Sequence, residues 1–206
     1  MEAENTQSRL SLFLVIFVSL TTIFGSVTFY AMSAKPSQAF IGLGLYSQRG
    51  LQGYIPNSNL TIPTGQTLNW TLAVTNRMNK AEFVLINTLI GNFSSTAPNA
   101  TTPSTPPSTT LLGGTEQFIN DGETSRINFN WTIESSYQTG RLTYLNVSIN
   151  GQSAVSSAPV GAASGRNFRL IFELWTFDPA SGSFQYGYPG QTSQVGNWLQ
   201  VWFNAS

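Results

Sequence analysis

Apolar side chains recur at every second position in several segments of this chain, and this period constrains the fold more than any other feature. Residues 127–134 show it clearly, with apolar Ile127, Phe129, Trp131 and Ile133 separated by polar residues. Successive side chains of a β-strand point to opposite faces, so this alternation is typical of a strand with one buried face. Similar segments lie between clusters of Gly, Pro, Asn and Ser, at 39–46, 67–75, 82–90, 126–134, 141–149, 167–177 and 197–204, with shorter ones near 116–119 and 183–188.

No segment after residue 35 has a convincing helical period. Many short strands separated by turns favour an antiparallel sandwich over any fold that needs helices. The sequence therefore predicts an all-β domain over residues 35–206, an antiparallel immunoglobulin-like β-sandwich.

A Thr/Ser/Pro-rich segment at 92–114 separates the third and fourth predicted strands. Proline lacks the backbone donor that a sheet ladder needs. A loop of this length in a compact domain is usually functional or disordered. We expect an exposed, mobile, glycosylated excursion.

The apolar segment 10–34 contains no charged residue and is dominated by Leu, Phe, Ile and Val. A helix needs about 20 such residues to cross the hydrocarbon core of a membrane. The segment predicts one transmembrane helix after a short cytoplasmic N-terminus at 1–9. The alternative is a signal peptide cleaved near Ala31-Met32-Ser33, although its apolar region is usually only about 7–15 residues long.

Seven Asn-x-Ser/Thr patterns follow the apolar segment, and none precedes it. Asn69, Asn130 and Asn146 fall on the polar face of predicted strands. The pattern marks N-glycosylation of an outside-facing surface, so we expect covalent N-glycans on a single-pass cell-membrane protein whose C-terminal domain lies outside. The alternative is an ordinary solvent-facing sheet surface without sugar. The acceptor asparagines are Asn59, Asn69, Asn92, Asn99, Asn130, Asn146 and Asn204.

The chain has no Cys and no His, and only 9% of its residues are charged, nine basic and nine acidic. These absences exclude a Ser-His-Asp triad, a Cys-His nucleophile and imidazole or thiolate metal sites. With equal numbers of basic and acidic residues, the chain has no excess of positive charge that would indicate binding of nucleic acid. We therefore expect a non-enzymatic protein with no catalytic residue, no metal site and no cofactor. With so few titratable groups, we also expect stability to depend weakly on pH.

Carboxylates are the remaining chemistry-bearing groups of the outer domain. A pair of them could hydrolyse glycosidic bonds, so a carbohydrate-active enzyme stays open as a further class. The segment Asp121-Gly122-Glu123 favours a turn over a calcium site. Glu173 lies in an apolar strand, where an arginine such as Arg169 would be a structural partner.

The last strands are the most aromatic part of the chain. In 197–204 one face carries Leu199, Val201 and Phe203, and the other carries Trp198, Gln200 and Trp202. A two-layer sandwich leaves the second face either covered, for instance by residues 182–190, or available to a partner. Exposed tryptophans are typical of interfaces. Trp198 and Trp202, together with Trp175, form the predicted partner surface.

Several segments resemble the C-terminal domain of an archaeal membrane family, the domain of unknown function 1616. The matching residues are Val74-Thr75-Asn76 with Glu82-Phe83-Val84, Asp121-Gly122-Glu123-Thr124 before Phe129-Asn130-Trp131, and 168–174 with 198–202. The resemblance covers roughly residues 60–204. It implies membrane helices followed by an immunoglobulin-like outer domain, and it carries over no functional residue. This chain differs in its single apolar segment and in the Thr/Pro-rich insertion.

Together these features predict a non-enzymatic single-pass cell-envelope glycoprotein. Its role would be an interaction module or an accessory subunit of a membrane complex, with a protein partner in the envelope or a second copy of itself. The alternative is a secreted thread- or pilus-like filament subunit with a cleaved signal peptide. In that case the freed residues 39–46 would complete the sheet of a neighbouring copy by strand addition.

Overall fold

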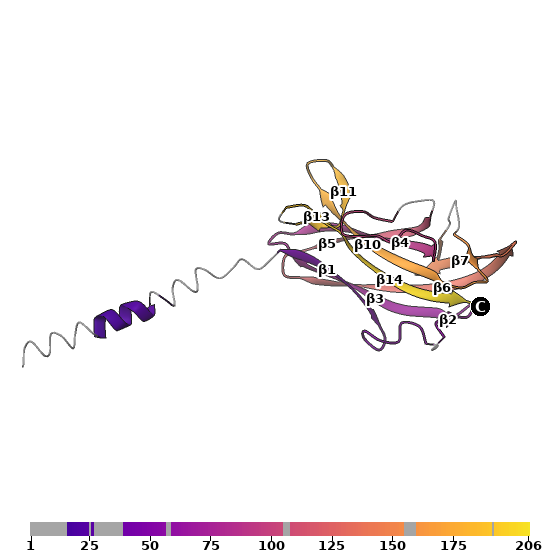
Figure 1. Cartoon of the computed structure of the whole chain (residues 1–206), viewed down its shortest axis with the longest axis horizontal. Helices are drawn as coiled ribbons and strands as arrows, with labels where there is room; N and C mark the ends of the chain where they lie inside the picture. The colour runs from indigo at the N-terminus through magenta and orange to yellow at the C-terminus, as the bar shows by residue number, and fades with distance from the viewer. Residues whose placement is uncertain are drawn as a thin grey trace, which may run out of the picture. The chain divides into compact units, whose positions relative to one another are not determined.

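The computed structural model describes residues 16–24, 26, 39–56, 59–104, 108–154, 160–190 and 192–206. The chain divides into two units, residues 1–38 and residues 39–206. In the first unit residues 16–24 are helical (Figure 1). No helix within the described residues is long and apolar enough to cross a membrane. Most of the predicted transmembrane segment at 10–34, and all of 1–9, lie outside the described residues, so the anchor stays a prediction.

The second unit is built from two β-sheets (Figure 1). The first sheet has the order β1-β3-β6-β7-β8, with β9 paired to β7. Its strands are β1 (Phe40–Ser47), β3 (Thr67–Arg77), β6 (Thr124–Thr139), β7 (Leu142–Ile149), β8 (Gln152–Ala154) and β9 (Ala162–Ala163).

The second sheet has the order β2-β14-β10-β4-β5, with β11 paired to β10. The pairing of β14 with β2 is parallel, and β10 pairs antiparallel with β4, β11 and β14. A separate ribbon joins β12 (Tyr188–Pro189) to β13 (Gln194–Val195). The sheet's own strands are β2 (Thr61–Ile62), β4 (Glu82–Asn92), β5 (Thr109–Ile119), β10 (Phe168–Asp178), β11 (Ser183–Tyr186) and β14 (Asn197–Ala205).

Aromatic side chains from the two sheets meet in one core. The ring centroid of Phe172 on β10 lies 4.9 Å from that of Phe129 and 6.5 Å from that of Trp70. Trp131 on β6 contacts Phe203 on β14 at 5.1 Å. Burying a large apolar side chain contributes about 1.5–3 kcal/mol, so these rings account for much of the adhesion between the sheets. The predicted all-β architecture of two packed sheets is confirmed, but the prediction that its strands are antiparallel throughout is wrong for the parallel pair β2–β14.

The predicted alternation in residues 127–134 is confirmed at its centre. Phe129, Trp131 and Ile133 are 3%, 1% and 0% exposed, whereas Asn130 is exposed. The strand itself continues to Thr139, past its predicted end at 134. A register shift between Ile133 and Ser135 interrupts the alternation there, and the exposed polar residues that follow give no periodic signal.

The Thr/Ser/Pro-rich loop is shorter and less exposed than predicted. Strand β5 begins at Thr109, so the residues from there to 114 pair with β4. All four prolines of the predicted loop precede Thr109, which leaves the later residues free to join the ladder. Residues 93–104, which we call the covering segment, bury Ser95, Pro98 and Ser104. The expected exposure is therefore confirmed for most of these residues and wrong for Ser95, Pro98 and Ser104.

Candidate glycan acceptors and interaction surface

Two of the predicted acceptors lie opposite each other on the outer face of the first sheet. Asn69 on β3 is the register partner of Asn130 on β6, and both side chains are exposed. The residues that follow them, Trp70 and Trp131, are 3% and 1% exposed. The strand alternation thus turns each tryptophan into the core and each acceptor outward, as predicted.

The third acceptor of the first sheet, Asn146, is exposed on β7. Its Nδ2 donates to the Ser135 hydroxyl, 2.8 Å away. Hydroxyl pairs cross the neighbouring strands: Thr67 and Thr132 lie 2.9 Å apart, as do the side chains of Thr75 and Thr124. The outer face of this sheet is therefore a polar surface on which the three acceptors project from β3, β6 and β7.

Two further acceptors lie in exposed turns. The side-chain oxygen of Asn59 accepts from the Thr61 N–H at 3.1 Å, and that of Asn99 accepts from the N–H groups of Thr101 and Thr102, each at 2.9 Å. These bonds fix the local turns through the oxygen of the amide. Within the described part of the chain, neither side-chain nitrogen makes a hydrogen bond, so both nitrogens are accessible.

The remaining two acceptors, Asn92 and Asn204, are half-buried and hold distant segments together. Asn92 Nδ2 donates to the Gly161 carbonyl at 2.7 Å. Asn204 Nδ2 donates to the Asn59 carbonyl at 3.1 Å, while its oxygen accepts from the Asn167 N–H at 2.9 Å. In these two residues the side-chain nitrogen that would carry a sugar already donates a hydrogen bond to a distant segment of the chain.

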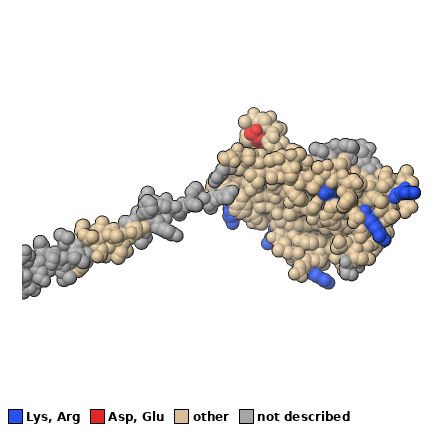
Figure 2. Space-filling model, in the orientation of Figure 1, with Lys and Arg blue, Asp and Glu red and all other residues tan. Residues whose placement is uncertain are grey.

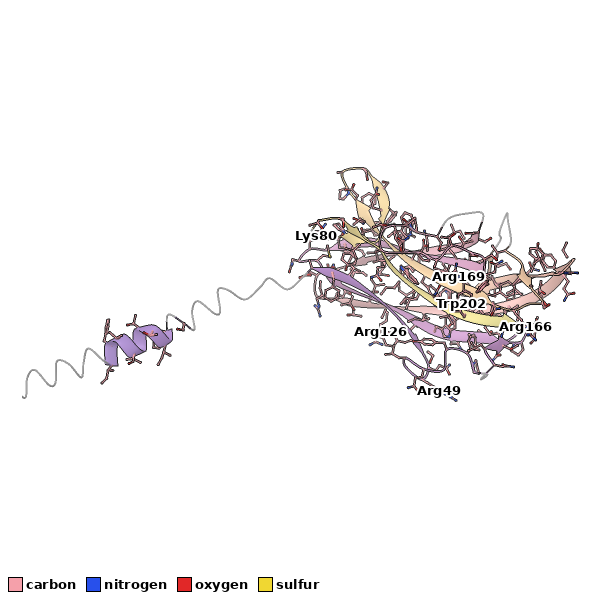
Figure 3. The ribbon with its side chains drawn as sticks, viewed as in Figure 1. Arg49, Lys80, Arg126, Arg166, Arg169 and Trp202 are labelled. Atoms are coloured by element: carbon pink, nitrogen blue, oxygen red, sulfur yellow. The ribbon has the colours of Figure 1, made fainter. Side chains whose placement is uncertain are left out.

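The three tryptophans of the predicted partner surface are half-buried. The Arg169 guanidinium lies 5.2 Å from the ring centroid of Trp202, and the two side chains are seen together in Figure 3. Trp175 makes an edge contact with Tyr186 at 5.6 Å. Trp198, on the same outer face of the sheet as Trp202, faces Glu173 in the register of β10 and β14. These side chains keep part of their surface accessible to a partner.

The segment 182–190 was one predicted cover for Trp198 and Trp202. Its strand β11 pairs with Thr176–Asp178 of β10, at the edge of the same sheet. Both this segment and the covering segment reach the residues just before β14: a Cβ added at Gly196 would lie 2.6 Å from the Tyr186 ring, and the Gly196 N–H donates to the Ala100 carbonyl at 2.6 Å. The cover by residues 182–190 therefore stays a prediction.

Two charged side chains of β10 are buried beneath the covering segment. Arg169 is 3% exposed and donates to the Ser95 carbonyl, and a second guanidinium nitrogen donates to Gln200 at 3.2 Å. Glu173 is 1% exposed and accepts from the Ser104 N–H at 2.6 Å. The prediction that Arg169 is the ionic partner of Glu173 is wrong: among the described residues the ion pair found is Lys80–Glu82 at 3.0 Å.

Burial shifts the titration of these groups. Desolvation raises the pKa of Glu173, while hydrogen bonds from Ser104 act in the opposite direction without cancelling it. Desolvation also lowers the pKa of Arg169. Tyr186, whose hydroxyl donates to the Asn99 carbonyl at 3.0 Å, has a pKa raised by burial and then by the nearby Glu173. The backbone of the covering segment is thus hydrogen-bonded to three titratable side chains, Arg169, Glu173 and Tyr186.

A row of phenylalanines crosses the outer face of the second sheet and was not predicted. Phe118 on β5 is the register partner of Phe83 on β4, and Phe177 on β10 is that of Phe184 on β11. The Phe83 ring lies 6.1 Å from Phe177 and 5.3 Å from Phe184. Phe118 is 58% exposed, and the other three are half-buried. Each residue occupies an outward position in its strand, but sequence alone does not show that these strands are neighbours.

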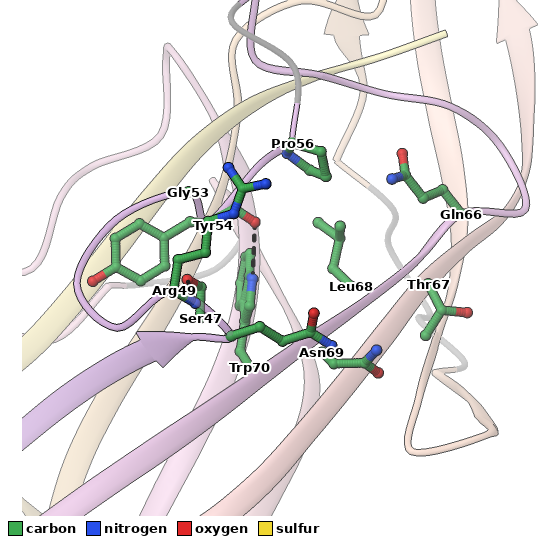
Figure 4. A pocket seen from close by; sticks show the side chains of 11 residues that line it. Ser47, Arg49, Gly53, Tyr54, Pro56, Gln66, Thr67, Leu68, Asn69 and Trp70 are labelled. Carbon is green, nitrogen blue, oxygen red and sulfur yellow. Dashed lines mark hydrogen bonds between the residues drawn. The ribbon is translucent and has the colours of Figure 1, made fainter.

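A pocket of ≈ 270 Å³ lies between the 47–56 loop and β3, with Arg49 and Asn69 on its rim (Figure 4). Trp70 forms part of its wall, and its indole nitrogen donates to the Tyr54 carbonyl at 2.9 Å. This bond fixes the loop against the strand. The pocket places polar side chains beside one acceptor and contains no carboxylate.

Charged side chains are sparse on the face of the molecule drawn in Figure 2. The described residues contain no group of three or more Asp and Glu that could hold a metal ion. Asp121-Gly122-Glu123 forms the predicted turn, with Gly122 at φ 79° and its N–H donating to the Asn76 carbonyl at 2.9 Å. These carboxylates therefore serve local structure.

No protein-family model matches the chain, and no curated protein matches it. The resemblance to the archaeal family stays a prediction.

Solved structures show a distant likeness. A β-glucosidase from intestinal bacteria, described as involved in saponin metabolism, is 12% identical with a TM-score of 0.40, over 80% of this chain and 16% of that one. A β-glucosidase from Erythrobacter marinus is 10% identical with a TM-score of 0.39, over 82% and 16%. The sporulation control protein Spo0M of Bacillus subtilis is 9% identical with a TM-score of 0.33, over 83% and 50%. This chain spans at most half the length of these proteins, and similarity at this level supports no inference about function.

Proposed function

We propose that this chain is a non-enzymatic, single-pass cell-envelope glycoprotein whose C-terminal domain lies outside the membrane and acts as an interaction module or an accessory subunit of a membrane complex. One observation carries the proposal: five of the seven acceptor asparagines are exposed, and three of these project from one face of one sheet. An Asn-x-Ser/Thr pattern on a surface loop or face marks a secreted surface. The uncharged segment 10–34, long enough to span a bilayer, supplies the matching topology.

The strand order supports an immunoglobulin-like domain. In such sandwiches one sheet has the spatial order first, second, fifth and fourth strand, and the other contains the third, sixth and seventh strands, to which variable-type domains add two more. Here β14, β10, β4 and β5 follow one another in the second sheet, as the seventh, sixth, third and an added strand do in variable-type domains. The first sheet has the order β1-β3-β6-β7, in which the last two strands are exchanged relative to the immunoglobulin order. Domains of this kind commonly serve recognition at cell surfaces.

Two apolar surfaces are available for a partner. One is the outer face of β14, where Trp198 and Trp202 remain partly exposed. The other is the phenylalanine row, with Phe118 most exposed at 58%. Aromatic side chains dominate the energetics of protein interfaces. Glu173, the most deeply buried carboxylate of the described residues, accepts a hydrogen bond from the Ser104 backbone N–H, which fits a structural role for this side chain.

The test is purification of the full chain from its native host in mild detergent, followed by intact-mass measurement and identification of the proteins that co-purify. We expect residues 1–34 to be retained, glycans to be attached, and a defined envelope partner to be present at a fixed ratio. Trp198→Ala should weaken this association, whereas Leu51→Ala, which alters a side chain 67% exposed at another place, should leave it intact. Equal association of both variants would contradict the proposed surface.

The secreted filament subunit remains a second candidate because of β1. This strand lies at one edge of the first sheet, and residues 40–47 carry no charge that would discourage strand addition. Its buried side chains Ile41 and Leu45 are those that a neighbouring copy would have to accommodate. A native mass lacking residues 1–34, together with filaments visible by electron microscopy, would favour this candidate over the anchored one.

A further inference from the structure

The seven acceptor patterns differ in what their side-chain nitrogens do in the folded domain. Asn92 and Asn204 use this nitrogen to bind the carbonyls of Gly161 and Asn59. These bonds join segments 69 and 145 residues apart in the sequence. Both side chains are half-buried, so a sugar on either nitrogen would have to displace the segment it contacts.

Asn69 and Asn130 are accessible, but they are close together. They are register partners on the antiparallel strands β3 and β6. Directly opposed residues of such strands have Cβ atoms about 4.5–5.5 Å apart, and their side chains stand roughly perpendicular to the sheet. Two sugars attached there would start side by side on one face, at a spacing narrower than a hexose ring with its hydroxyl groups.

The chemistry of attachment leaves the acceptor little freedom to avoid this crowding. The Asn side-chain nitrogen attacks the anomeric carbon of an oligosaccharide activated on a lipid phosphate. A carbon–nitrogen bond forms, the bond from that carbon to the phosphate oxygen breaks, the lipid phosphate leaves with the electron pair, and the nitrogen loses one proton. The first sugar is therefore held directly at the amide, with only the short Asn side chain between it and the sheet.

We propose that the folded domain sorts its acceptors: Asn92 and Asn204 stay unmodified as structural amides, and Asn69 and Asn130 are alternative positions for a single glycan. This inference rests on the proposed function, which requires that the domain be glycosylated at all. The exposed acceptors Asn59, Asn99 and Asn146 have no acceptor as register partner. They are independent sites.

The test counts glycans per molecule by intact mass, using the full chain from its native host and the variants Asn69→Gln, Asn130→Gln and the double variant. We expect each single variant to carry the same number of glycans as the wild type, because the other position takes over. The double variant should carry one fewer. Asn99→Gln is the matched control and should lose one glycan by itself. Glycopeptide mass spectrometry of the wild type should show Asn92 and Asn204 unmodified.

Loss of one glycan in each single variant and two in the double variant would overturn the proposal of alternative positions. An unchanged count in the double variant would overturn it as well, because neither position would be used. Modified peptides containing Asn92 or Asn204 would overturn the sorting of structural amides. A wild-type mass without any glycan is a different result, because it would contradict the proposed function itself.

Discussion

Arg169 and Glu173 project from the same face of β10, and each binds the backbone of the covering segment near one of its ends. Arg169 donates to the Ser95 carbonyl, and Glu173 accepts from the Ser104 N–H. Hydrogen bonds to charged groups contribute about 1.5–3 kcal/mol each, but burying the charges offsets much of this gain. The covering segment is therefore held by hydrogen bonds to two buried charged groups. The net stability that each bond contributes is the difference between the energy of the bond and the cost of burying the charge.

The first prediction concerns the pH dependence of stability. Because the pKa of Glu173 is raised in the folded domain, the folded state binds a proton at this group more tightly than the unfolded chain does. Its contribution to stability therefore increases as pH falls through the folded pKa, and is complete below the unfolded pKa. Glu173→Gln removes the titration while keeping an acceptor for Ser104. We expect the stability of the variant to exceed that of the wild type most at neutral pH, and this difference in stability to become smaller as pH falls.

Thermal unfolding of both proteins across the acidic range measures this difference. Asp178 acts with the opposite sign, because hydrogen bonds from Ser181 and Ala180 lower its pKa. It is present in both proteins, so it cancels in the comparison. Unfolding midpoints that stay a constant distance apart at every pH would contradict the role given to Glu173.

The second prediction concerns the contact between the sheets. Phe172 is 0% exposed and meets the rings of Trp70 and Phe129 across the core. Truncating a buried phenylalanine to alanine typically removes about 3–5 kcal/mol of stability. Phe172→Ala should lower the free energy of unfolding by that amount, measured by denaturant titration. Phe93→Ala, at a side chain 80% exposed, is the control and should change it by less than about 0.5 kcal/mol.

Strand alternation explains how much of this fold could be predicted. It places Trp70 and Trp131 inside and Asn69 and Asn130 outside, because neighbouring side chains in a strand take opposite faces. It does not predict that the two asparagines are opposite each other. Register depends on which strands pair and at which offset, and β3 and β6 are separated in the sequence by two strands of the other sheet.

The covering segment could not be predicted from composition. Serine, threonine and proline are mostly exposed residues, so residues 93–104 read as a solvent-facing loop. A signal was nonetheless present in another segment, because Arg169 and Glu173 interrupt an otherwise apolar strand and buried charges need partners. From the sequence alone, Arg169 and Glu173 are the natural partners of each other. Two residues four apart on one strand are too distant for an ion pair, so each binds the backbone that covers it.

The third prediction tests a buried side chain that organises the β3–β4 connection. Asn76 is 0% exposed, and its Nδ2 donates to the carbonyls of Lys80 at 2.8 Å and Ile119 at 2.9 Å. Its oxygen accepts from the Met78 N–H at 2.9 Å. Asn76→Ala leaves these groups unsatisfied, at a cost of about 1–3 kcal/mol for each buried one. We expect a loss of at least about 2 kcal/mol in denaturant unfolding, since two carbonyls lose a donor.

The fourth prediction compares two glycines that share a left-handed conformation. Gly187 has φ 77° and Gly182 has φ 66°. A Cβ at Gly187 would lie 2.0 Å from the Val195 carbonyl oxygen, whereas one at Gly182 would meet nothing within 4 Å. Both alanine variants bear the conformational strain of about 1–2 kcal/mol, but only Gly187→Ala must also push apart two backbone segments. We expect Gly187→Ala to lower the unfolding midpoint clearly more than Gly182→Ala, and hydrogen exchange to increase around Gly196. Equal midpoints would show that the close approach of Gly187 to Val195 does not stabilise the domain.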